Sequence, residues 1–132
     1  MKQTYLGLAA TALVLLASSC KEPGPTAGEL NVNLTTPNTD DGAIQFTASA
    51  NTPATITGLS SACSGCKLFV VKVNDNQYKG VLTGSLAAGT LFRLGVSDTK
   101  NTGSYSVTIN AVASRTYATR NSVTGYSIAL AP

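Results

Sequence analysis

Two cysteines in the middle of the chain have the spacing of a redox site. Cys63 and Cys66 stand in the order Cys-Ser-Gly-Cys, and this C-x-x-C motif is used by enzymes that exchange thiols and disulfides. Such enzymes place the first cysteine at a helix N-terminus, which lowers the pKa of its thiol. Here residues 67–71 (KLFVV) follow and are typical of a strand. The sequence therefore favours a structural disulfide, with a thiol-disulfide oxidoreductase as the alternative.

Other catalytic chemistry is limited by the residue types that the chain lacks. Its 132 residues include no histidine and no tryptophan, which excludes a Ser-His-Asp or Cys-His unit and any imidazole metal ligand. A zinc site would need two soft ligands beyond Cys63 and Cys66. Six scattered carboxylates do not favour a two-carboxylate hydrolase. We therefore expect a protein that is not an enzyme and that uses no cofactor or metal.

Two acidic or amide-rich segments could offer oxygen ligands to calcium. They are Asp40 with Asp41, and the Asn-Asp-Asn sequence at residues 74–76. Neither has the spacing of an EF-hand loop, and Asn and Asp are also the residues that turns prefer. We interpret both segments as turns. The formal charge of +3 is too small and too dispersed to indicate nucleic-acid binding.

One aromatic residue near the C-terminus stands between two arginines. Arg115, Tyr117 and Arg120 lie in the segment SRTYATRN, and an aromatic ring beside guanidinium groups can stack on sugars or bind an anionic polysaccharide. If the segment is a strand, Arg115 and Tyr117 share one face and Arg120 lies on the other. Charged residues on an exposed strand also prevent edge-to-edge pairing. These three residues are candidate ligand contacts.

The first twenty residues predict where the protein is exported. Lys2 precedes an uncharged apolar run at residues 5–17, which is too short to span a bilayer, and small residues then lead to Cys20. This pattern resembles the lipobox of bacterial lipoproteins, in which cleavage before the cysteine follows its attachment to diacylglycerol. The resemblance implies a signal peptide at residues 1–19 and a membrane anchor of acyl chains such as palmitate on Cys20. An ordinary secreted protein cleaved nearby is the alternative.

Residues 30–132 are expected to be an all-β domain. Apolar and polar residues alternate with period two, no segment repeats with helical period, and turn signals recur every 8–12 residues or so. This pattern predicts seven to nine short strands in a single antiparallel β-sandwich, of jelly-roll or immunoglobulin-like type. The positions expected to face the core are residues 30, 32 and 34, residues 44, 46 and 48, residues 92, 94 and 96, residues 105, 107, 109 and 111, and residues 126, 128 and 130. Residues 20–29, rich in Pro and Gly, are expected to be a flexible tether.

Three stretches of the domain resemble the cohesin-type sandwich modules of secreted bacterial proteins. They are residues 41–48 (DGAIQFTA), 82–96 (LTGSLAAGTLFRLGV) and 103–113 (GSYSVTINAVA). The resemblance implies the sandwich architecture and the binding of a protein or polysaccharide, and it identifies no contact residues. We therefore expect a non-catalytic lipoprotein, anchored to a bacterial cell envelope at the periplasmic face or the cell surface. Its sandwich would bind an envelope protein or glycan, or act as a structural module.

Overall fold

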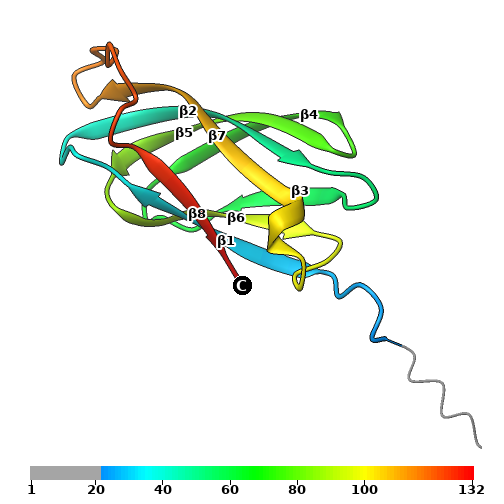
Figure 1. The fold of residues 1–132 in the computed structure, drawn as a ribbon. Coiled ribbons are helices and arrows are strands. Elements are labelled where there is room, and N and C mark those ends of the chain that lie inside the picture. Colours follow the sequence, from blue (N-terminus) through cyan, green and yellow to red (C-terminus); the bar gives the residue numbers. More distant parts are fainter. Residues whose placement is uncertain (1–21) are drawn as a thin grey trace, which may run out of the picture.

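Strands make up most of residues 22–132, the part of the chain that the computed structural model describes (Figure 1). They are β1 (Gly28–Thr35), β2 (Asp41–Ala50), β3 (Ile56–Ser61), β4 (Lys67–Asn74), β5 (Gln77–Leu86), β6 (Gly89–Val96), β7 (Tyr105–Ser114) and β8 (Ser127–Ala131). A single turn of 3-10 helix, η1 (Thr102–Ser104), precedes β7. None of the described segments is a helix long and apolar enough to cross a membrane. The expected signal peptide and Cys20 lie outside the described residues.

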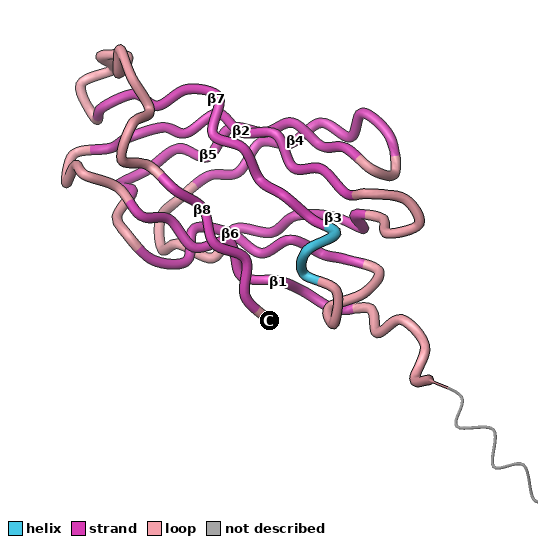
Figure 2. Tube along the Cα trace, in the orientation of Figure 1, coloured by secondary structure: helices cyan, strands magenta, loops and turns pink. Residues whose placement is uncertain are grey.

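The strands form two four-stranded sheets that pack face to face (Figures 1 and 2). One sheet has the order β3-β6-β1-β8, the other has the order β4-β5-β2-β7, and the strands in both pair in antiparallel fashion. The predicted all-β antiparallel sandwich is therefore confirmed, with eight strands in the described residues.

Apolar side chains from both sheets fill the space between the layers. At its centre, the ring of Phe46 on β2 stacks on the ring of Phe92 on β6, with centroids 4.5 Å apart. Three of the predicted core faces are confirmed, because each of their members is at most 3% exposed: Leu30, Val32, Leu34, Ile44, Phe46, Ala48, Phe92, Leu94 and Val96. The alternation of apolar residues therefore identified the faces of β1, β2 and β6 that pack on one another.

The predicted face of β7 is correct in its first half only. Ile109 pairs with Phe46, but Ala111 pairs with Gln45, so Asn110 is an extra residue without a partner on β2. Such a bulge reverses the alternation beyond it. Val112 therefore points into the core, and the prediction that Ala111 lies on the core face was wrong. The Asn110 side chain instead donates a hydrogen bond to Thr47 Oγ1 (2.8 Å) on the solvent side.

The antiparallel arrangement collects two different sets of loops at the two ends of the sandwich. One end, called here the tether end, holds residues 22–27, where the chain enters, and the loops at 51–55, 75–76 and 97–104. The opposite far end holds the loops at 36–40, 62–66, 87–88 and 115–126. In Figure 1 the incoming chain and the orange loop between β7 and β8 lie on opposite sides of the molecule.

The ordered contacts begin before the predicted domain boundary at residue 30. Strand β1 starts at Gly28, and the amide of Thr26 donates a hydrogen bond to Asp98 Oδ1 (3.1 Å). The amide of Thr99 donates in turn to the carbonyl of Thr26 (2.7 Å). The last residues expected in the tether are therefore fixed to the loop between β6 and β7.

Candidate functional site

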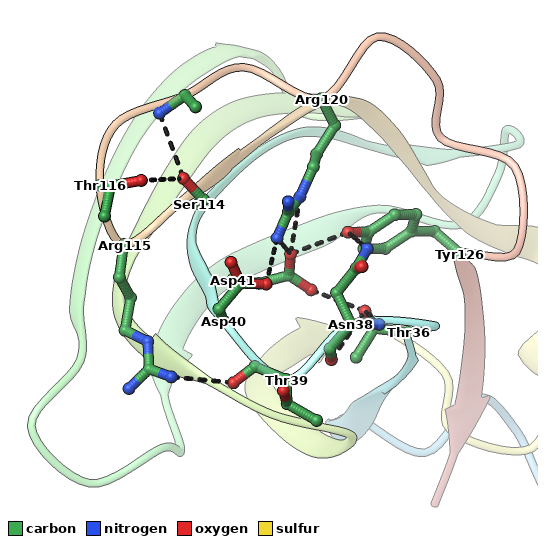
Figure 3. A network of polar contacts seen from close by, with 11 residues as sticks. Thr36, Asn38, Thr39, Asp40, Asp41, Ser114, Arg115, Thr116, Arg120 and Tyr126 are labelled. Atoms are coloured by element: carbon green, nitrogen blue, oxygen red, sulfur yellow. Dashed lines mark hydrogen bonds and ion pairs between the residues drawn. The ribbon is translucent and has the colours of Figure 1, made fainter.

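A buried carboxylate organises the far end of the sandwich. Asp41, the first residue of β2, is fully buried. Its Oδ1 accepts a hydrogen bond from the Tyr126 hydroxyl (2.8 Å), and its Oδ2 accepts one from the Thr36 hydroxyl (2.6 Å). The Arg120 guanidinium forms an ion pair with Oδ1 at 3.1 Å, and Asn38 Nδ2 donates to the Tyr126 hydroxyl (2.7 Å). Figure 3 shows how these side chains converge on Asp41.

Arg120 joins this network to the neighbouring acidic residue. Its Nη2 contacts Asp40 Oδ1 as well as Asp41 Oδ1. Within the described residues, each buried side-chain nitrogen or oxygen has a hydrogen-bond partner. The network therefore links the loop at 36–40 to the loop at 115–126, and its carboxylate is held as an ion-pair partner and not as a free acid or base.

The surroundings of Asp41 keep its carboxyl ionised. Burial on its own raises the pKa of Asp41, but the hydrogen bonds from Thr36, Tyr126 and Arg120, together with the charge of Arg120, outweigh it and bring the pKa below its ordinary value. The two carboxylates raise the pKa of Arg120. Both members of the pair are therefore charged in neutral solution.

This pair is expected to make the protein sensitive to acid. A carboxyl group whose pKa is lower in the folded state contributes stability above its unfolded pKa, which is about 3.9 for Asp. That contribution is lost as the pH falls through the lower pKa of the folded state. We expect the free energy of unfolding to be nearly level between about pH 5 and 7 and to fall below about pH 4. Urea unfolding at a series of pH values measures this.

The Asp41→Asn variant is the control for the acid prediction. Its side chain cannot ionise, so the fall in stability below about pH 4 should become shallower than in the wild-type protein. A wild-type curve and an Asp41→Asn curve that run parallel through the acid range would contradict the assignment of this sensitivity to Asp41.

The candidate ligand residues 115, 117 and 120 lie on a turn and not on the strand considered above. Strand β7 ends at Ser114, whose carbonyl accepts a hydrogen bond from the amide of Tyr117 (2.9 Å). The Ser114 hydroxyl accepts one from the amide of Ala118 (3.2 Å). Tyr117 has a positive φ of 66°, a conformation that is uncommon for a residue with a side chain. Its side chain projects into solvent and is 92% exposed.

The turn places Arg115 beside Tyr117 and separates both from Arg120. Arg115 Nη2 donates to the carbonyl of Thr39 (3.0 Å). Arg115 and Tyr117 line one hollow of about 350 Å³, whose other walls are Gly42, Ala43, Thr83, Gly84 and Ser114. Arg120 is held by Asp40 and Asp41 instead. The pair of Arg115 and Tyr117 is thus the part of the predicted set that faces an accessible hollow.

Cys63 and Cys66 form a disulfide in a far-end loop, with their Cα atoms 5.5 Å apart. Cys66 is followed directly by β4, which begins at Lys67. The one helical turn in the described part of the chain, η1, lies at the tether end. The cysteines therefore lack the helix N-terminus that lowers a thiol pKa in redox enzymes. Cys66 also packs closely against Gly84, where an added Cβ would lie 3.0 Å from Cys66 Sγ.

The other acidic candidates belong to turns and ion pairs. Residues 74–76 form the predicted turn, in which the amide of Asn76 donates to the side-chain oxygen of Asn74 (2.8 Å). Asp75 pairs with Lys72 (2.7 Å). Among residues 22–132, no cluster of three or more Cys, Asp or Glu side chains could hold a metal ion.

The central role of Asp41 is not visible in the local sequence pattern. The alternation that buries Ile44 and Phe46 would place Asp41 on the solvent side. The pairing of β2 with both neighbours shifts between Asp41 and Ala43, and this irregularity at Gly42 turns Asp41 inward. Gly42 is required there because an added Cβ would lie 2.7 Å from the backbone of Arg115. The Asp-Asp-Gly sequence is the only local signal of this bulge.

No protein-family model, curated protein or solved structure matches this chain. The resemblance to cohesin-type modules and to lipoprotein signals therefore remains a prediction from the sequence.

Proposed function

We propose that the protein is an exported bacterial lipoprotein, anchored to an envelope membrane through acyl chains on Cys20, whose sandwich is a non-catalytic binding module. The observation that carries this proposal is the position of the chain entry relative to Tyr117. The chain enters at the tether end, and the exposed Tyr117 lies in the 115–126 loop at the far end. Anchoring through Cys20 would thus present Tyr117 away from the bilayer.

The dimensions of the sandwich support this orientation. Strand β2 has ten residues, and a strand rises about 3.3 Å per residue, so the far end lies about 30 Å from the tether end. Residues 22–27 are exposed and have no regular secondary structure. A short linker of this kind would keep the tether end near the membrane. The distance between the membrane and the far end would then come mainly from the length of the sandwich.

The conformation of Tyr117 supports a binding role for the far end. A large aromatic side chain gains nothing from folding when 92% of it is exposed, and a positive φ outside glycine costs about 1–3 kcal/mol. Strained residues on ordered loops occur preferentially at functional sites. We therefore assign Tyr117 to contact with a partner in the envelope.

The anchor can be tested by separating membranes from soluble protein in bacteria that express the full chain. The wild-type protein is expected in the membrane fraction, with an intact mass that fits residues 20–132 plus acyl chains. Because two or three acyl chains hold a protein stably on a bilayer, Cys20→Ser should lower the membrane-bound fraction about tenfold or more. The double variant Cys63→Ser, Cys66→Ser should stay with the membrane. Wild-type protein that is soluble and free of lipid would rule the anchor out.

A further inference from the structure

The outward side of the sheet β4-β5-β2-β7 is a second surface with the character of a binding site. The register places its residues in three rows that run across the four strands. The first row is Lys67, Thr83, Ala43 and Ala113, the second is Phe69, Val81, Gln45 and Ala111, and the third is Val71, Lys79, Thr47 and Thr108. We call these twelve residues the outer face. The opposite side of the same strands carries the buried Ile44, Phe46 and Leu82.

Two adjoining hollows lie on the outer face towards the far end. One, of about 350 Å³, lies over the second row and is lined by Ala43, Val81 and Ala111 among others. The other, of similar volume, is the hollow beside Arg115 and Tyr117, and it also includes Ala43. Both hollows are lined largely by small residues, among them Ala43, Ala111 and Gly84, so a ligand can approach the sheet closely.

Exposed aromatic rings stand at two borders of this surface. Phe69 lies on the edge strand β4 and is 60% exposed, and Tyr117 extends from the turn that follows β7. Tyr117 lines one of the hollows, and Phe69 pairs with Val81, which lines the other. Aromatic rings beside open hollows are suited to stack on the apolar ring faces of a ligand.

The charged residues of the outer face are both basic. Lys67 and Lys79 belong to it and Arg115 borders it, and none of the three forms an ion pair with a carboxylate in the described residues. Four carboxylates lie at the tether end: Glu22 and Glu29 near the chain entry, and Asp75 and Asp98 in loops. Asp40 lies beside Arg115, whose amide donates to its carbonyl (2.8 Å), but the carboxylates of Asp40 and Asp41 pair with Arg120. The surface is therefore complementary to an anionic ligand.

We propose that the outer face, together with Arg115 and Tyr117, binds an acidic polysaccharide. Carboxylates of the sugar units would pair with Lys67, Lys79 and Arg115, and sugar rings would stack on Phe69 and Tyr117. An acidic peptide offers the same charges, but it does not offer regularly spaced sugar rings whose C–H faces pack on the two aromatic side chains. This proposal deepens the binding role proposed above and names the class of ligand.

Binding of oligogalacturonate to the full-length protein, extracted from membranes in a zwitterionic detergent, tests the proposal. We expect saturable binding in isothermal titration calorimetry that weakens as salt is raised, and no binding of neutral dextran. The double variant Lys67→Glu, Lys79→Glu should lower the affinity at least tenfold, because two attractive charges become repulsive. Tyr117→Ala should lower it about three- to tenfold through the loss of ring stacking.

The double variant Arg93→Glu, Lys100→Glu is the matched control. It makes the same change in net charge, but Arg93 lies on β6 of the other sheet and Lys100 lies in a tether-end loop. Its affinity for oligogalacturonate should stay within about twofold of the wild-type value, since charges farther apart than about 10 Å are screened. Both double variants replace exposed side chains, and their urea unfolding curves should match that of the wild-type protein.

Three results would overturn the proposal. An equal loss of affinity in the two double variants would show attraction to net charge without a site. Polyglutamate that binds as tightly as oligogalacturonate, with no effect of Tyr117→Ala, would indicate an acidic protein partner. Absence of any binding would exclude an acidic glycan of this type. The anchor proposed on Cys20 is tested by fractionation, so each of these results leaves it unaffected.

Discussion

The variant Phe46→Ala is expected to lose about 3–5 kcal/mol of unfolding free energy, the largest effect anticipated for a single substitution. Phe46 lies on an inner strand of its sheet and is 1% exposed. Its ring stacks on Phe92 of the opposite sheet, so truncation removes contacts that join the two layers. Domains of this size are stable by about 5–15 kcal/mol in total, and the loss is a large part of that.

The neighbours of Phe46 cannot move to fill the cavity that its truncation would leave. The ring lies over Gly80 of β5, where an added Cβ would come within 2.5 Å of Phe46 Cζ. Neighbouring strands cannot collapse into the space without breaking their ladders, so a cavity remains. Equilibrium unfolding in urea measures the effect. The control is Tyr117→Ala, which removes an aromatic side chain that is 92% exposed. It should change the free energy of unfolding by less than about 0.5 kcal/mol. A loss below about 1 kcal/mol in Phe46→Ala would contradict this account of the core.

The second large effect is expected for Asp41→Ala, at about 2–3 kcal/mol. The substitution removes the acceptor of the Tyr126 and Thr36 hydroxyls and one of the two carboxylates that hold Arg120. The two hydroxyls are partly buried, and donors that lose their acceptor in such a place bear much of the cost of leaving water. The Arg120 side chain is 23% exposed, so water can still solvate its charge. The expected loss of unfolding free energy is therefore smaller than for a wholly buried ion pair.

Asp40→Ala is the matched control for this prediction. Asp40 contacts the same guanidinium, but its side chain is 55% exposed, and exposed ion pairs contribute about 0–1 kcal/mol. Urea unfolding should therefore show a clearly larger loss of stability for Asp41→Ala than for Asp40→Ala. Equal losses in the two variants would show that the hydrogen bonds of Asp41 to the Thr36 and Tyr126 hydroxyls contribute little.

Much of the fold could be predicted from the sequence because alternation reports directly on which side of a strand is buried. It located the core faces of β1, β2 and β6. It could not locate the bulges at Gly42 and Asn110, because a bulge depends on how two strands pair and not on either strand alone. The inward position of Asp41 and the outward position of Ala111 both follow from these bulges.

The candidate site was only partly predictable because its contacts join residues far apart in the chain. The Tyr126 hydroxyl reaches Asp41 across 85 positions and Arg120 reaches it across 79. Residues 67–71 indicated a strand, but not that this strand lies at a sheet edge and leaves Phe69 and Val71 more than half exposed. Lys67 and Lys79 could not be grouped from the sequence either, because only the pairing of β4 with β5 brings them to one face.

The way in which the chain enters the sandwich determines how the domain would carry mechanical load. Strand β1 pairs with β6 from Gly28 to Leu34 and with β8 from Asn31 to Thr35, so it has hydrogen-bonded neighbours on both sides. If the domain is anchored through Cys20 as proposed, a pull on that anchor would act along the axis of β1. It would strain both ladders at once, in shear, instead of opening one hydrogen bond after another. A ligand held at the far end would then load the domain along β1, the direction in which the hydrogen bonds of both ladders resist together.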